Sequence, residues 1–162
     1  MAAAALRTIS RLFVLATALA AWGVSAACDL ASAAQQVLGE WQCEFQTDLG
    51  VAALRLTLRE IDGESVRGTY EYATPLTGPV TGELRGDLSV AGPGEDGTEA
   101  SCSYRLEGSW SEVTAGGLTG SGDLVFDFVA DRSFTGYWTE VGGTGRYRWN
   151  GRKVAPGPAV PD

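Results

Sequence analysis

The 162-residue sequence contains no histidine, and Lys153 is its only lysine. The absence of histidine excludes Ser-His-Asp triads, histidine metal sites and the commonest general base. Basic residues are scarce as well, because 12 Lys and Arg stand against 20 Asp and Glu, and the formal net charge is −8. A chain this acidic is not expected to bind the backbone of a nucleic acid. We therefore expect no histidine-based catalysis, no metal or other cofactor, and no nucleic-acid partner.

Long apolar runs are also absent, except near the N-terminus. Residues 1–27 contain Arg7 and Arg11, then an apolar run over residues 12–24 and three small residues, a pattern typical of a secretory signal peptide. The run is shorter than the ~20 apolar residues that span a bilayer as a helix. We expect cleavage after Ala26 or Ala27 and export of the remaining chain to the periplasm or the extracellular space.

Cysteine is limited to Cys28, Cys43 and Cys102. Residues 25–28 resemble the bacterial lipobox, although Ser25 stands where that motif usually has leucine. Lipidation of Cys28 is thus an alternative to ordinary processing. It would anchor the protein to a membrane and leave an even pair of thiols for a disulfide in an oxidising compartment.

A disulfide between Cys43 and Cys102 is left open by the sequence. Cys43 follows closely after Trp41, whereas Cys102 lies well before Trp110. If these two tryptophans lie at the same height in the barrel, the two cysteines lie at different heights. A bridge requires Cα atoms within about 7 Å of each other. Only a large stagger between strands or a folded-over loop would bring the pair together.

A short pattern recurs along the chain: an apolar residue, any residue, glycine, any residue and an aromatic residue. Strand side chains alternate between two faces, so the apolar residue, the glycine and the aromatic share one face. Glycine inside a strand marks a bend or a close approach, which suits a sheet that curls around rings. The strong copies are residues 37–41, 66–70, 106–110 and 134–138, with a weaker copy at 80–84 and a reversed one at 149–151.

The same alternation, extended along each expected strand, predicts which aromatic residues face inward. Tyr137 is the exception, because it falls out of phase. The predicted interior consists of Trp41, Phe45, Tyr70, Tyr72, Tyr104, Trp110, Phe126, Phe128, Phe134, Trp138, Tyr147 and Trp149.

Alternating runs and turn residues predict an all-β fold. We expect a single small antiparallel up-and-down β-barrel of about eight strands, because closure removes exposed sheet edges. Residues 28–38 are expected to form a tether or short helix, 39–154 the barrel and 155–162 a disordered Pro-rich tail. The expected strands are 39–45, 51–60, 65–72, 80–90, 101–112, 123–128, 133–140 and 146–153.

Gly39 and Trp41 near the first strand, the eight-strand meander and basic residues on the last strand resemble the calycin group, which includes lipocalins and avidins. In lipocalins this tryptophan packs near a basic residue, and the resemblance implies Arg152 for that place. Cys43 replaces the polar ligand residue of avidins, so the resemblance does not imply biotin binding. The repeats also resemble those of uncharacterised bacterial secreted proteins, which implies no activity.

Two carboxylates are the strongest candidates for chemistry. Glu112 and Glu140 each follow an inward tryptophan by two residues, so alternation aims both into the barrel mouth opposite the repeat glycines. A carboxylate pair can hydrolyse glycosides. The preferred interpretation is that both glutamates are solvated residues of the rim. Ligand binding is the second interpretation, and catalysis is the least favoured. The candidate ligand-binding residues are Trp41, Tyr72, Trp110, Glu112, Trp138 and Glu140.

The sequence therefore predicts an exported, non-enzymatic envelope protein that acts as a structural, interaction or inhibitor module. Its partner would be an unknown envelope protein. The alternative is a calycin-like carrier of a small apolar or aromatic ligand. Which of the two applies depends on whether the barrel is filled by its own rings or leaves a cavity.

Overall fold

The computed structural model describes residues 28–48, 50–76, 78–93, 102–129 and 132–155. The expected signal peptide and nearly all of the expected tail lie outside these residues. No helix in these ranges is long and apolar enough to cross a membrane.

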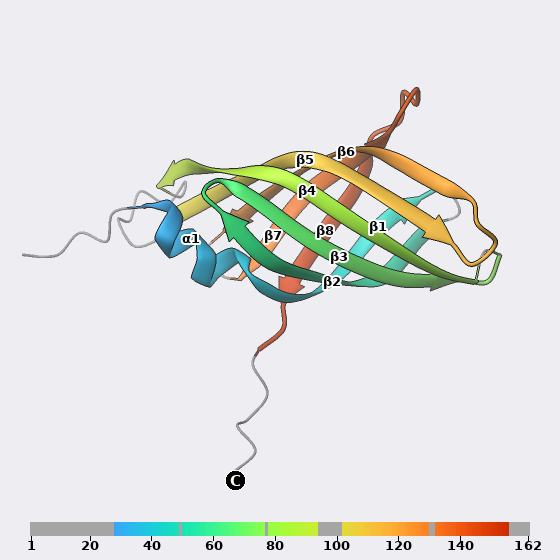
Figure 1. The fold of residues 1–162 in the computed structure, drawn as a ribbon, viewed down its shortest axis with the longest axis horizontal. Helices are drawn as coiled ribbons and strands as arrows, with labels where there is room; N and C mark the ends of the chain where they lie inside the picture. The colour runs from blue at the N-terminus through green and yellow to red at the C-terminus, as the bar shows by residue number, and fades with distance from the viewer. Residues whose placement is uncertain (1–27, 49, 77, 94–101, 130–131, 156–162) are drawn as a thin grey trace, which may run out of the picture.

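The described chain forms a closed antiparallel barrel in which every strand pairs with its neighbours in sequence and β8 pairs with β1 (Figure 1). The predicted all-β up-and-down barrel is confirmed. The elements are α1 (Leu30–Val37), β1 (Gly39–Thr47), β2 (Gly50–Asp62), β3 (Ser65–Thr74), β4 (Gly78–Pro93), β5 (Cys102–Thr114), β6 (Thr119–Val129), β7 (Ser133–Glu140) and β8 (Tyr147–Lys153).

Two of the repeat glycines lie under aromatic rings of the neighbouring strand. The ring of Phe134 lies over Gly151, and that of Tyr70 lies over Gly82. A Cβ atom at either glycine would overlap the ring that covers it. These two glycines therefore make room for aromatic side chains, whereas leucine side chains lie over Gly68 and backbone atoms of β4 lie against Gly108.

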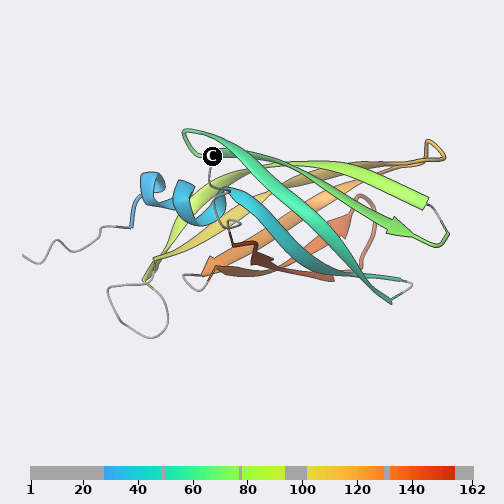
Figure 2. The same cartoon turned by 90° about the horizontal axis from the view of Figure 1, so that it is seen from below.

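Helix α1 sits at one end of the barrel, seen at the left of Figures 1 and 2. The Asp29 carboxylate caps it by accepting a hydrogen bond from the Ser32 amide at 2.7 Å. Ala33 and Val37 face the core and are fully buried. The helix thus places apolar side chains against the adjacent end of the barrel interior.

The carboxyl end of α1 is joined to the first and last strands. The Trp41 indole donates to the carbonyl of Val37 at 3.0 Å. The Lys153 ammonium donates to the carbonyls of Gln35 and Gln36 at 2.7 and 2.9 Å, and lies 5.7 Å from the Trp41 ring centroid.

The expectation that Arg152 packs near Trp41 is therefore wrong. Trp41 pairs across the strands with Lys153, so alternation along β8 turns Arg152 to the outer face, where it is exposed.

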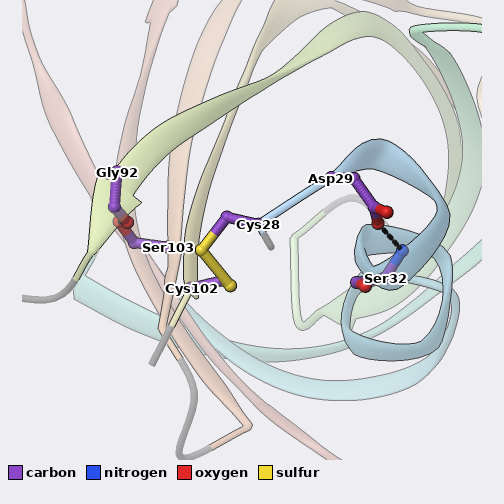
Figure 3. The surroundings of a disulfide bond; sticks show 6 residues. All are labelled: Cys28, Asp29, Ser32, Gly92, Cys102 and Ser103. Carbon is purple, nitrogen blue, oxygen red and sulfur yellow. Dashed lines mark hydrogen bonds between the residues drawn. A yellow bond between two sulfur atoms is a disulfide. The ribbon is translucent and has the colours of Figure 1, made fainter. Parts of the chain in front are cut away.

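A disulfide joins Cys28 to Cys102, with the two Cα atoms 5.4 Å apart (Figure 3). It ties the chain two residues before α1 to the first residue of β5, at the helix end of the barrel. The candidate bridge between Cys43 and Cys102 is wrong, because Cys43 lies in β1, four strands from β5 around the barrel. The bridge uses the Cys28 sulfur to which a lipid would be attached, so it is an alternative to the predicted lipidation.

Cys43 is a free, buried thiol. Burial raises the pKa of the Cys43 thiol to about 12, and Trp149 lowers this pKa by a smaller amount. The Trp149 indole nitrogen is buried without a hydrogen-bond partner among the described residues.

Aromatic rings fill the half of the barrel next to α1. Trp41 contacts Phe128 and Phe134, each with ring centroids 5.3 Å apart, and Phe126 stacks on Phe134 at 4.4 Å. All four residues are almost completely buried. The sequence left a filled barrel and an open one as alternatives, and this half is filled.

Candidate ligand-binding pocket

The opposite end of the barrel contains a pocket of about 380 Å³. It opens between the turns that follow β1, β3, β5 and β7, and no helix among the described elements covers it. Its lining residues are Phe45, Thr47, Asp48, Leu54, Tyr70, Tyr72, Trp110, Glu112, Trp138, Glu140 and Trp149.

Five of the six predicted ligand-binding residues line this pocket, and Trp41 does not. Alternation along β3, β5 and β7 brings Tyr72, Trp110 and Trp138 to its inner surface, as expected. Trp41 lies at the helix end, where it packs under α1. Its inclusion in the site is therefore wrong.

Glu112 is the polar centre of the pocket. Its Oε2 atom accepts a hydrogen bond from the Tyr70 hydroxyl at 3.1 Å, and the Tyr72 hydroxyl bridges Oε1 and Oε2 at 3.1 and 3.2 Å. The carboxylate is half-buried. Two neutral donors therefore hold it in one orientation.

Gly82 makes this arrangement sterically feasible. It pairs with Tyr70 on β3 and with Glu112 on β5, so the three residues form one row across the sheet. The Tyr70 side chain crosses the position above Gly82 to reach the carboxylate, and a Cβ atom there would lie 2.5 Å from Cε1 of the ring. The role of Gly82 in leaving room for Tyr70 was not predicted, although Gly82 is the glycine of the weak repeat copy at residues 80–84.

The electrostatics of the pocket follow from burial and from the two tyrosines. Burial raises the pKa of Glu112 above its ordinary value, the hydrogen bonds from Tyr70 and Tyr72 oppose that shift, and the nearby charge of Glu140 adds to it. Burial and the negative charge of Glu112 raise the pKa of both phenols. The phenols are therefore neutral hydrogen-bond donors at neutral pH.

Two hydrogen bonds at the pocket mouth join β7 and β8 to the end of β1 and the turn that follows it. The Trp138 indole donates to the carbonyl of Gln46 at 3.2 Å, and the Tyr147 hydroxyl donates to Asp48 Oδ1 at 2.7 Å. The Trp138 ring also stacks on Tyr147 at 4.5 Å and meets the edge of Trp110 at 5.2 Å. These contacts hold the turn after β1 against β7 and β8.

The rim around the mouth carries exposed aliphatic residues. Val51, Leu76, Leu118 and Val141 lie in or beside the four hairpin turns of this end, and each is 70–77% exposed. We call these four residues the aliphatic rim. None of the four lines the pocket, so they form an exposed apolar surface around this end of the barrel.

A larger hollow of about 1050 Å³ lies on the outer wall of the barrel. It is lined mainly by side chains that point to solvent, such as Gln42, Arg55 and Arg152. Mixed, solvated charges are typical of an outer barrel wall. We therefore place the candidate site in the smaller pocket, where partly buried polar groups converge with aromatic rings.

No group of three or more His, Cys, Asp or Glu in the described part of the chain could hold a metal ion.

No protein-family model matches the chain, and no curated protein matches it in sequence. Solved structures of β-barrels do match. The redesigned barrel mFAP1, bound to DFHBI, aligns with a TM-score of 0.53 and 15% identity over 75% of this chain and 98% of that one. The likeness shows the fold.

Two further solved structures align less well. The redesigned barrel b11L5F_LGL gives a TM-score of 0.48 with 12% identity over 76% of this chain and 96% of that one. A fluorescence-activating β-barrel designed de novo gives 0.47 with 16% identity over 75% of this chain and 97% of that one.

Proposed function

We propose that this protein binds a small aromatic or apolar molecule in the pocket at the open end of its barrel, as a calycin-like carrier. The observation that carries the proposal is the cavity of about 380 Å³, in which Tyr72, Trp110 and Trp138 surround the half-buried carboxylate of Glu112. An apolar pocket with a few converging polar groups is the usual form of a small-molecule site. The role is non-enzymatic.

Two observations support parts of this proposal. The redesigned barrel mFAP1, which has the same fold, was solved bound to DFHBI. The disulfide between Cys28 and Cys102 supports export, because such bridges persist in oxidising compartments.

The role predicted first from the sequence, an envelope interaction or inhibitor module, is the second candidate. The aliphatic rim favours it, because exposed apolar residues gathered at one end of a barrel suit contact with another protein. A stoichiometric partner recovered from envelope extract, and lost when Leu76 and Leu118 are replaced by serine, would support this role.

The pocket proposal is tested with N-phenyl-1-naphthylamine, a neutral aromatic probe whose emission rises in apolar surroundings. We expect saturable binding of one probe molecule to the protein. The Leu54→Trp variant should abolish it, because Leu54 lines the pocket and a larger side chain there occupies the cavity.

The matched control is Val51→Trp, which adds the same indole on β2 at an exposed position. It should bind the probe as the wild type does. The proposal fails if a folded Leu54→Trp variant binds the probe unchanged, or if the wild type binds neither this probe nor any of the smaller aromatic probes 2-phenylethylamine, 2-phenylethanol and phenylacetate. Circular dichroism establishes that each variant is folded.

A further inference from the structure

The charges that line the pocket all have one sign. Asp48, Glu112 and Glu140 contribute carboxylates, and the lining includes no lysine or arginine. Within the described part of the chain, the recorded ion pairs join Arg85 and Arg105 to acids of the outer wall, and none includes Glu112 or Glu140. No basic side chain among the described residues therefore pairs with the negative charge inside the pocket.

Glu112 also keeps capacity to accept hydrogen bonds. An ionised carboxylate offers about four acceptor sites, and here two hydroxyl donors share its two oxygens. A partly buried carboxylate gains most from a partner that brings both a donor and a positive charge. The phenols of Tyr70 and Tyr72 supply donors without that charge.

The rings around Glu112 suit a cation as well. Tyr70 and Tyr72 lie nearly parallel with centroids 6.4 Å apart, and Trp110 meets Trp138 edge to face. Aromatic faces attract ammonium groups, and the attraction grows when water is excluded. The same rings provide apolar area for the remainder of a ligand.

We propose that the ligand is an organic cation, a small aromatic or aliphatic amine whose ammonium group pairs with Glu112 while its apolar part lies against Tyr72, Trp110 and Trp138. This inference rests on the proposed function and specifies its ligand class. Anionic ligands are disfavoured, because three carboxylates face the same space. A neutral ligand leaves the charge of Glu112 unpaired.

Three probes of nearly equal size test the effect of ligand charge alone. They are 2-phenylethylamine, 2-phenylethanol and phenylacetate, which are cationic, neutral and anionic, respectively, at pH 7. Isothermal titration calorimetry gives the dissociation constant of each. We expect the amine to bind at least about tenfold more tightly than the alcohol, because a hydrogen bond to a charged partner contributes more than a neutral one. Phenylacetate should bind most weakly.

The Glu112→Gln variant keeps the shape of the side chain and removes its charge. It should weaken binding of the amine to about the level of the alcohol, with little change for the alcohol. The matched control is Glu64→Gln, which removes an equal charge from an exposed turn at the helix end of the barrel. It should leave all three dissociation constants unchanged, which separates local pairing from the net charge of the protein.

The outcomes distinguish this inference from the function on which it rests. If the alcohol or phenylacetate binds as tightly as the amine, the cation inference is overturned and the pocket remains a binding site. The same conclusion holds if N-phenyl-1-naphthylamine binds and none of the three probes does. An amine preference that survives in Glu112→Gln overturns the assigned role of Glu112. If neither the naphthylamine nor any of the three binds, the proposed function fails together with the inference.

Discussion

Replacing Gly82 by alanine tests the link between the glycine repeat and the pocket. A Cβ atom at Gly82 would overlap the phenol ring of Tyr70. That residue is only 5% exposed, packs edge to face on Trp149 at 5.3 Å and bonds to Glu112, so its ring cannot move aside without losing these contacts. Overpacking a core costs about 1–3 kcal/mol. Alanine recovers roughly 0.5–1 kcal/mol over glycine in a strand.

We therefore expect Gly82→Ala to lower the free energy of unfolding by about 1–2 kcal/mol in urea titrations. The variant should also raise the pKa of Glu112 further, because the Tyr70 hydroxyl no longer stabilises the ionised carboxylate. Carboxyl chemical shifts followed by NMR against pH measure this second effect.

The matched control is Gly116→Ala, which makes the same change in a turn where the new methyl group meets only Thr114 Oγ1 at 3.8 Å. Its free energy of unfolding should stay within about 0.5 kcal/mol of the wild type. If Gly82→Ala is as stable as this control and the titration of Glu112 is unchanged, the row from Tyr70 to Glu112 does not exist as described.

Three further outcomes are expected. Gly136→Val should lower the free energy of unfolding by about 1–3 kcal/mol, since its Cβ would overlap the Val125 carbonyl and come within 2.7 Å of the Phe126 ring. The outward Thr135→Val should be nearly neutral, and thermal unfolding of the two variants measures the difference. Replacing Cys28 and Cys102 by serine should lower the free energy of unfolding by about 2–4 kcal/mol. A reducing agent should destabilise the wild type but not this double variant. Binding of 2-phenylethylamine should weaken as the pH falls below neutrality, because the pKa of Glu112 is raised and protonation removes the charge that pairs with the amine; a calorimetric profile that stays flat under acidic conditions would contradict this.

The barrel could be predicted because one signal repeats along the whole chain. Alternation, the inward glycines and the turn residues each act locally, and all of them agree on a meander. The predicted ranges differ from the observed strands mainly at the open end. There β4 begins at Gly78 and β6 at Thr119, since the hydrogen-bonded ladder continues past the last inward apolar residue. Helix α1 was expected only as one of two alternatives, because eight residues have little intrinsic helix stability and depend on packing.

The cysteine pairing could not be read from the sequence in the same way. A disulfide depends on where two distant residues lie in space, and the short helix α1 directs the preceding chain toward the start of β5. The expected difference in height between Cys43 and Cys102 depends on tryptophans at one level, but Trp41 lies at the helix end of the barrel and Trp110 lines the pocket at the open end. The small residues before Cys28 indicated lipidation, and nothing in the sequence indicated that Cys28 pairs with Cys102.

The error over Trp41 arises from the tilt of the strands. Cross-strand pairing places Trp41 opposite Leu56, which lies opposite Tyr70, and the row continues through Gly82 to Glu112. Strands in a closed barrel are tilted and staggered, so a row perpendicular to the strands climbs along the barrel axis as it passes around the wall. This row begins beneath α1 at Trp41 and reaches the open mouth at Glu112.

Equivalent positions of the repeat therefore do not lie at equivalent heights. The copy on β1 contributes its tryptophan to the filled half of the barrel, whereas the copies on β5 and β7 contribute Trp110 and Trp138 to the pocket. Alternation fixes which side chains point inward, but the stagger decides which end of the interior each one reaches. One sequence pattern thus produces both a closed aromatic core and an open aromatic site, and only the pairing register separates the two.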